Sequence, residues 1–314
     1  MIGQIPRRQE PDINPSVPSV NSVVAASDHL RHPRNLCFPR RPRSRARGRF
    51  DILAEMDIAA GASFPPVTPP PEVSGRPIPW TPRDVLIGVL LFIGIFVILP
   101  LPVAVPLAFM SDPESRTVMG VGIALSAPIY LCVLWVTARM TFGKYGGSWE
   151  RLGVVRPTWA TAGWAAVALL AAFTAAGIYT ALINYFNIDA LSQDCGDQVP
   201  DTVRNSALLM AMAGVLAVVF APVVEELFFR GFIFPGLARA WGPIAGIVAS
   251  GVLFGSAHLL GNPMLYKSMI EFSAIGMIFA FVYWRSGNIF SSMLAHFSFN
   301  LIGVILIAST TCQK

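Results

Sequence analysis

Charged side chains are scarce in this chain. Asp, Glu, Lys and Arg make up only 13% of its 314 residues, whereas 54% of the residues are hydrophobic. The mean hydropathy of +0.58 lies far from the balance of a soluble domain. This composition excludes an ordinary water-soluble enzyme and indicates a polytopic membrane protein.

Cysteine is also sparse, and the four cysteines are widely separated. They are Cys37, Cys132, Cys195 and Cys312. None of them has the CxxC or Cys/His spacing that a structural zinc site needs. The cysteines therefore indicate neither a disulfide framework nor a zinc knuckle.

Acidic residues are almost absent from the first 50 residues, where ten Arg face only Glu10, Asp12 and Asp28. Ten minus three gives this segment +7 against a net charge of +5, so the remaining residues sum to −2. No hydrophobic stretch of signal-peptide type occurs before residue 80. Residues 1–80 are rich in Pro, Arg and Ser, and we expect a disordered, solvated tail. Because the basic charge belongs to this tail, we expect no nucleic-acid partner.

A further hypothesis is that translation of the native protein starts at Met56. The residues before Met56 differ in composition from the rest of the chain. Mass spectrometry of the native N-terminus tests this hypothesis, and recovery of peptides from residues 10–50 would contradict it.

Residues 81–314 read as an all-α membrane domain. A helix needs about 20 apolar residues to cross a bilayer, and seven stretches of suitable length occur. An eighth helix is expected if Phe228 to Ala240 forms a short helix of its own. Pro100, Pro102 and Pro106 predict that the first stretch kinks or stops early. The stretches lie at about 85–110, 118–138, 159–184, 206–227, 243–261, 268–284 and 288–309.

Loop charges predict the orientation of these spans. The loop at residues 139–158 carries four basic residues against one acid, whereas the loop after the third span carries four aspartates. By the positive-inside rule the first of these loops is cytoplasmic. We therefore expect a multi-pass protein of the cell membrane with a cytoplasmic N-terminus.

Three charges interrupt the fourth apolar stretch. Glu225, Glu226 and Arg230 are the only charged residues between Arg204 and Arg239, and an ionisable group is costly to bury in a membrane. On a helix Glu226 and Arg230 share a face in the favourable order for an ion pair. Glu225 points about 100° away, so it is predicted to lack that partner and to be available as a general base.

Two further polar pairs follow in later stretches. Phe254 precedes His258 by four residues, and His296 precedes Asn300 by four, so each pair shares one helical face. A histidine alone in such a place is more often a core residue that bonds across helices. The gathering of all these groups in three late helices favours a functional site, because each of them resists burial.

The ordered motifs EExxxR, FxxxH and HxxxN resemble the CPBP family of membrane proteases, also called the Abi or type II CAAX prenyl endopeptidase family. The resemblance covers about residues 145–308. It implies an intramembrane glutamic peptidase without a metal cofactor. In that scheme Glu225 and His258 would activate a water molecule, and His296 and Asn300 would stabilise the oxyanion.

The remaining motif residues would have supporting roles in this scheme. Glu226 paired with Arg230 would hold the first helix in register, and Phe254 would support His258. The implied partners are the lipid bilayer and a membrane protein or lipidated peptide as substrate. The oligomeric state stays open.

Three alternatives remain at this stage. Glu225, His258 and His296 form a His2Glu set like that of several zinc peptidases, although the chain lacks an HExxH helix. Members of the family are also linked to non-catalytic scaffold functions and to bacteriocin self-immunity. A transporter is the third alternative, but no pair of interrupted helices in matching halves of a repeat is visible.

One difficulty concerns the depth of the site in the membrane. Counting residues places Glu225 near the end of a span at 206–227, whereas His258 lies late in the next span. If both belong to one site, either the fourth span extends toward Arg239, or Pro222 and Pro243 break the simple crossings.

Overall fold

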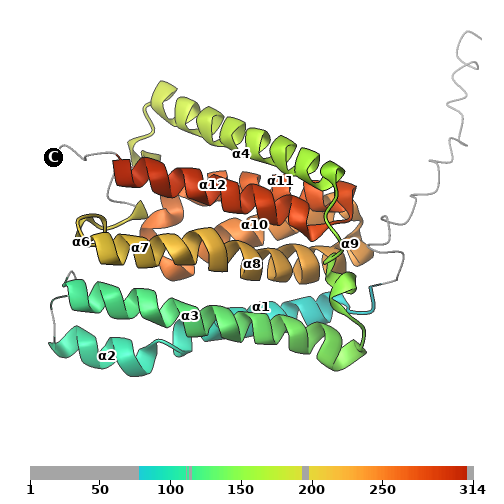
Figure 1. Ribbon diagram of the computed structural model, residues 1–314, viewed down its shortest axis with the longest axis horizontal. Helices are drawn as coiled ribbons and strands as arrows, with labels where there is room; N and C mark the ends of the chain where they lie inside the picture. Colours follow the sequence, from blue (N-terminus) through green and yellow to red (C-terminus); the bar gives the residue numbers. More distant parts are fainter. Residues whose placement is uncertain (1–77, 111, 113–114, 193–197, 310–314) are drawn as a thin grey trace, which may run out of the picture. The chain divides into compact units, whose positions relative to one another are not determined.

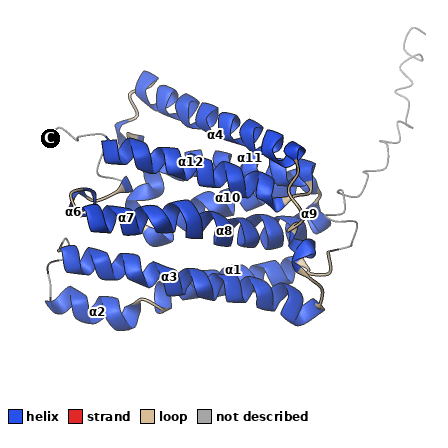
Figure 2. Cartoon of the chain, viewed as in Figure 1, coloured by secondary structure: helices blue, strands red, loops and turns tan. Residues whose placement is uncertain are grey.

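The computed structural model describes residues 78–110, 112, 115–192 and 198–309. The regular structure in these residues is helical, with no strand (Figure 2), so the all-α class is confirmed. The predictions for the N-terminal tail and for Met56 lie outside the described residues. The expected tail reached residue 80, but the Trp80 side chain is fully buried and its indole donates to the carbonyl of Phe232 at 2.9 Å.

In the part of the chain that the structure describes, seven helices are long and apolar enough to cross a membrane. Their number and order match the seven predicted stretches, and the chain is a multi-pass membrane protein. The spans are Pro82–Phe109, Arg116–Gly143, Trp159–Tyr185, Ala207–Trp241, Pro243–Gly261, Pro263–Ser286 and Ile289–Ser309. Short turns of helix lie between some of them, namely η3 (Trp149–Leu152), η4 (Asp189–Leu191) and α6 (Asp201–Arg204). The sixth span begins with another short turn, η7 (Pro263–Ser268).

The first span divides into α1 (Pro82–Ile98) and α2 (Leu101–Met110). The break falls at Pro100, as the proline cluster predicted, because proline lacks the backbone N–H that continues a helix. Asp84 caps the first turn by accepting from the backbone N–H and the hydroxyl of Thr81, each at 2.8 Å. The same carboxylate accepts from Lys144 and from Tyr145. It thereby joins the start of the first span to the end of the second, which comprises α3 (Arg116–Ala138) and η2 (Arg139–Gly143).

The fourth span is one continuous helix through residues 207–241. The span expected at about 206–227 thus extends to residue 241, which is one of the alternatives that a shared site for Glu225 and His258 required, and Phe228–Ala240 forms no separate helix. Two π-helical segments, η5 and η6, end just before Pro222 and Pro235, where proline cannot donate to the carbonyl four residues earlier. The wider π turns carry the helix past both prolines. Its parts are α7 (Ala207–Val215), η5 (Leu216–Phe220), α8 (Ala221–Glu225), η6 (Glu226–Ile233) and α9 (Phe234–Trp241).

A single residue, Gly242, joins α9 to α10 (Pro243–Gly261). Its φ of 83° lies in the region that favours glycine. A Cβ at Gly246 would lie 2.9 Å from backbone atoms of Ala238, so α10 turns back against α9. The hairpin therefore returns the chain along the fourth span.

α10 also packs tightly against α11 (Met269–Ser286) through small residues. A Cβ at Gly251 would lie 2.8 Å from the backbone nitrogen of Met277, and one at Gly255 would lie 2.6 Å from the carbonyl oxygen of Met269. These glycines form a GxxxG pattern, which allows two membrane helices to approach closely. The approach sets the position of α10 and of His258 near its end.

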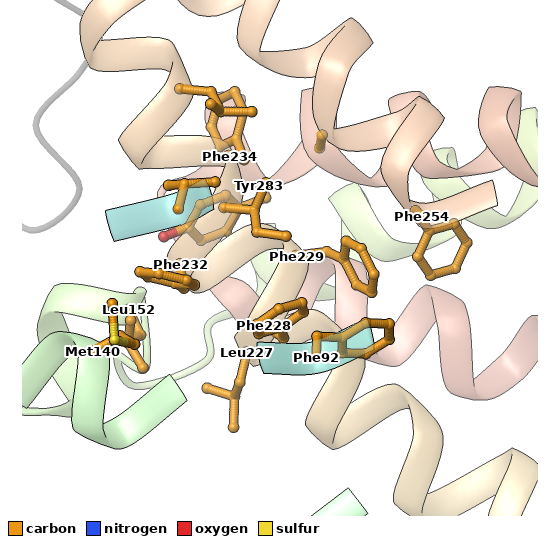
Figure 3. Close-up of a cluster of buried hydrophobic side chains, with 14 of the residues drawn as sticks. Phe92, Met140, Leu152, Leu227, Phe228, Phe229, Phe232, Phe234, Phe254 and Tyr283 are labelled. Carbon is orange, nitrogen blue, oxygen red and sulfur yellow. The ribbon is translucent and has the colours of Figure 1, made fainter. Parts of the chain in front are cut away.

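The remaining helices flank this centre. Figure 1 shows α4 (Trp159–Tyr185) lying along α11 and α12 (Ile289–Ser309), whereas α1 and α3 lie on the opposite side of the fourth span. An aromatic cluster fills the space between α1, η6 and α10 (Figure 3). Phe92 stacks on Phe228 with 4.9 Å between centroids, and Phe229 meets Phe254 edge-on at 5.3 Å. This packing fixes the fourth span where its charged residues occur.

Replacing Gly255 with Ala should destabilise the protein by about 1–3 kcal/mol, the usual cost of overpacking. The added methyl group would overlap backbone atoms of α11. The measurement is the thermal unfolding midpoint of purified protein in detergent. Gly94→Ala is the matched control, because nothing lies within 4 Å of a Cβ at that helical position. Equal midpoints for the two variants would contradict the close helix approach.

Candidate active site

A buried charge cluster joins the fourth span to α12. The Glu226 carboxylate Oε1 lies 3.0 Å from the Arg230 guanidinium Nη1 and 2.9 Å from His296 Nδ1. The side chains of Glu226 and Arg230 are completely buried, and that of His296 is only 5% exposed. The expected ion pair is thus present, but Glu226 also holds a histidine from another helix.

Arg230 is surrounded by groups that accept a buried cation. Its Nη2 donates to the carbonyl of Gly276 at 3.2 Å. The guanidinium carbon lies 4.3 Å from the ring centroid of Phe254 and 5.3 Å from that of Phe279, within the range of cation–π attraction. Arg230 therefore ties η6 to both α10 and α11.

Glu225 has a different environment from its neighbour. Its side chain is 17% exposed. Oε1 accepts a hydrogen bond from the Tyr130 hydroxyl at 3.3 Å, and Oε2 lies 3.9 Å from His296 Nε2. Oε2 is buried and has no hydrogen-bond donor among the described residues. As predicted, Glu225 is not paired with Arg230. Its contact with Tyr130 was not predicted from the sequence.

The two glutamates approach opposite nitrogens of one imidazole. A carboxylate only accepts hydrogen bonds, so the 2.9 Å contact with ionised Glu226 requires a proton on Nδ1 of His296. Nε2 is then directed toward Glu225. The arrangement fixes the imidazole ring through Glu226 and leaves its second nitrogen for the site.

His258 and Glu225 line the same cavity, which has a volume of about 160 Å³. One water needs roughly 10–15 Å³ by this kind of measure, so several waters fit. Nδ1 of His258 lies 2.9 Å from the carbonyl oxygen of Phe254. A carbonyl only accepts, so Nδ1 carries the proton and Nε2 is the acceptor of a neutral ring. The other residues around the cavity are Phe92, Phe96, Tyr130, Val133, Val224, Phe229, Ala257, Gly261, Asn262 and Leu265.

The hairpin at Gly242 explains how Glu225 and His258 can belong to one site although residue counting placed them at different depths. Glu225 precedes Gly242 by 17 residues and His258 follows it by 16. Because α10 returns along the extended fourth span, the two side chains reach similar levels. The extension of the span beyond residue 227 therefore brings Glu225 and His258 to one cavity.

Asn300 is placed apart from this cavity. Its side-chain nitrogen donates to the carbonyl of Ala217 at 2.7 Å, within the π-helical segment η5, and Asn300 does not line the cavity. It lies one helical turn beyond His296 on α12. One of its two amide hydrogens is thus used to join α12 to the fourth span.

Phe254 contacts both histidine rings. Its centroid lies 4.9 Å from that of His258 and 5.7 Å from that of His296. Among the described residues, no three His, Cys, Asp or Glu side chains are grouped so that they could hold a metal ion.

Two contacts of the site were not found from the sequence. The bond from His296 to Glu226 joins residues 70 positions apart, and no spacing rule distinguishes it from a bond to Glu225. The sequence did contain a signal for Tyr130. Membrane tyrosines are enriched near the ends of spans, whereas Tyr130 lies in the middle of an apolar stretch.

Comparison with known proteins agrees with the motifs. Residues 207–302 match the model of the family described as Type II CAAX prenyl endopeptidase Rce1-like. This segment is similar to that family, and we call it the Rce1-like segment. The matched segment contains all three motifs, which confirms the expected resemblance over residues 207–302 of the 145–308 for which it was expected.

One curated relative also matches the chain. It is named "Putative membrane peptidase YdiL" and comes from Bacillus subtilis (strain 168). The two are 26% identical over 144 residues, which make up 46% of this chain and 55% of the relative. The chain thus spans little more than half the length of this relative. No solved structure matches the chain.

Replacing Arg230 with Met should destabilise the protein by about 3–5 kcal/mol, because Glu226 would stay buried without its cation. Thermal unfolding in detergent measures the effect. Arg83→Met is the control, since Arg83 is exposed at the start of α1. The double variant Glu226→Met/Arg230→Met should recover part of the loss. A single Arg230→Met variant as stable as the wild type would contradict the role of the ion pair.

Proposed function

We propose that the protein is an intramembrane endopeptidase that hydrolyses peptide bonds of a membrane-associated substrate with a water activated by Glu225 and His258. The supporting observation is that these two side chains, from different helices, line one cavity large enough for water. Glu225 Oε2 has no donor among the described residues, and His258 Nε2 is left as an acceptor by the bond of Nδ1. Both groups are therefore suited to accept a proton from water.

The reaction proceeds in two proton transfers. The Glu225 carboxylate takes a proton from water while the oxygen bonds to the carbonyl carbon of the substrate, and His258 orients the same water. The carbonyl oxygen then carries the negative charge of a tetrahedral intermediate. When the C–N bond breaks, the proton held by Glu225 passes to the leaving nitrogen. Glu225 is ionised again at the end of the cycle.

His296 and Asn300 are the proposed donors to the oxyanion. The bond from Nδ1 of His296 to Glu226 leaves Nε2 as the ring nitrogen that would donate to the oxyanion when it carries a proton. Asn300 retains a second amide hydrogen beside the one bonded to Ala217. Donors that are held away from bulk water lower the barrier by several kcal/mol.

The proposed reaction uses no metal ion. The resident cation of the site is Arg230, whose guanidinium lies 3.0 Å from Glu226 and disfavours a divalent cation nearby by like-charge repulsion. Zinc held by Glu225, His258 and His296 is the alternative. Activity that disappears after chelation and returns with zinc would support that alternative.

The proposed substrates are membrane proteins or lipidated peptides. Most residues around the cavity are apolar, including Phe92, Phe96 and Phe229, and the matched family is described as a prenyl endopeptidase family. A farnesylated peptide is therefore the first probe. We place the protein in the cell membrane with its N-terminus in the cytoplasm, and protease accessibility of an N-terminal tag on intact cells tests that orientation.

Replacing Glu225 with Gln should lower kcat/KM by roughly 10²–10⁴-fold, because an amide cannot accept the proton of the attacking water. The assay uses an internally quenched peptide with a farnesylated cysteine and purified protein in lipid nanodiscs. Proteomics of membrane peptides from cells with the wild type or the variant covers unprenylated substrates.

The matched control is Glu150→Gln, which makes the same change at an exposed position of η3. Unfolding midpoints of both variants exclude a folding defect as the cause. If Glu225→Gln retains the cellular phenotype and no peptide differs, the protein acts as a non-catalytic scaffold or immunity protein instead.

A further inference from the structure

Tyr130 belongs to the cavity but lies outside the Rce1-like segment. It is the fifteenth of the 28 residues in the second span, Arg116–Gly143, and precedes residues 207–302 by a wide margin. Its side chain lines the cavity together with Glu225 and His258. A residue of α3 thus reaches the groups that are proposed to carry the chemistry.

The hydroxyl of Tyr130 is used differently from its neighbours on the same span. Ser126, Thr137 and Thr141 each donate to a carbonyl four residues earlier in their own helix. Such bonds satisfy the hydroxyl locally and join nothing else. The Tyr130 hydroxyl instead donates to the carboxylate of Glu225 on another helix.

The contact distinguishes the two oxygens of the Glu225 carboxylate. Tyr130 lies 3.3 Å from Oε1, whereas His296 Nε2 lies 3.9 Å from Oε2. The Tyr130 distance exceeds the usual range for a hydroxyl donor, so this hydrogen bond is a long one. With Oε1 held by the phenol, Oε2 is the oxygen left to accept a proton.

We propose that Tyr130 is a positioning residue of this site, which orients the Glu225 carboxylate and stabilises its charged form by donating to Oε1. The catalytic effect of Tyr130 rests on the proposed function. The contact between Tyr130 and Glu225 does not. It implies that the three motifs alone do not complete the site. The second span supplies a part of it.

Titratable groups from four other elements surround Glu225. Tyr130 faces it from α3, His258 from α10, His296 from α12 and Arg230 from η6, and Glu226 follows it directly in the chain. Of these, only Tyr130 is a neutral donor in hydrogen-bond contact with Glu225. Removing its hydroxyl therefore changes one interaction and leaves the charges in place.

Tyr130→Phe removes this hydroxyl and keeps the ring. Infrared difference spectra measure the protonation of Glu225. The band of its carboxyl group is the one that disappears in the Glu225→Gln variant. The protonation midpoint of this band should move up by about one pH unit, because a hydrogen bond to a charged group is lost. With the farnesylated peptide as substrate, the acidic limb of the pH profile of kcat/KM should also move to higher pH. At a pH on that limb, kcat/KM should therefore be roughly 10-fold lower than in the wild type.

Tyr283→Phe is the matched control. Tyr283 is a fully buried tyrosine whose hydroxyl has no hydrogen-bond partner among the described residues, and it lies outside the cavity lining. The same atom is removed, so the Glu225 midpoint should stay at the wild-type value. Replacement of Tyr130 by 3-fluorotyrosine is a second variant that keeps the hydroxyl and makes it a stronger donor, and it should move the midpoint down.

The outcomes separate the two proposals. An unchanged midpoint in both Tyr130 variants overturns the positioning role, whatever the cleavage assay shows. A shifted midpoint with no cleavage by the wild type supports the contact and counts against the proposed peptidase. Cleavage that is lost in Glu225→Gln but unchanged in Tyr130→Phe at every pH supports the peptidase and overturns the catalytic consequence of Tyr130.

Discussion

The buried ion pair of Glu226 and Arg230 is the interaction on which the rest of the site depends. Neither side chain is exposed, and either charge alone would be strongly destabilising inside an apolar bundle. The surroundings of the pair meet this requirement. Aromatic rings and the Gly276 carbonyl contact Arg230, and His296 donates to Glu226. Satisfying the pair thereby fixes the fourth span against α10, α11 and α12.

This fixed frame gives two adjacent glutamates different properties. Glu225 ends α8 and Glu226 begins the π-helical segment η6, so the change of helix type falls between them. Glu226 is fully enclosed, whereas Glu225 borders the cavity with His258 and keeps one carboxylate oxygen without a donor among the described residues. Two acids that are neighbours in the chain therefore have different environments, one enclosed in an ion pair and the other at the wall of a cavity.

The Rce1-like segment does not form the cavity by itself. Phe92 comes from α1 and Tyr130 from α3, and both contribute to its wall. The first two spans are in turn held together by Asp84, which accepts from Lys144 and Tyr145. The hydrogen bond with Asp84 raises the pKa of Lys144, which keeps this lysine charged beside its carboxylate. The earlier spans thus close a site whose motifs lie in the later ones.

The sequence by itself determined the membrane class, the number and order of the seven spans and the break at Pro100, because hydropathy, length and proline act locally along the chain. It also identified Glu225, Glu226, Arg230 and the two histidines, since ionisable groups stand out in apolar helices. Only the tertiary structure decided that Glu226 binds His296 as well as Arg230, that Asn300 is bonded to Ala217, and that Tyr130 reaches Glu225. Those contacts depend on helix rotation, on π turns before two prolines and on the hairpin at Gly242, and residue spacing specifies none of these.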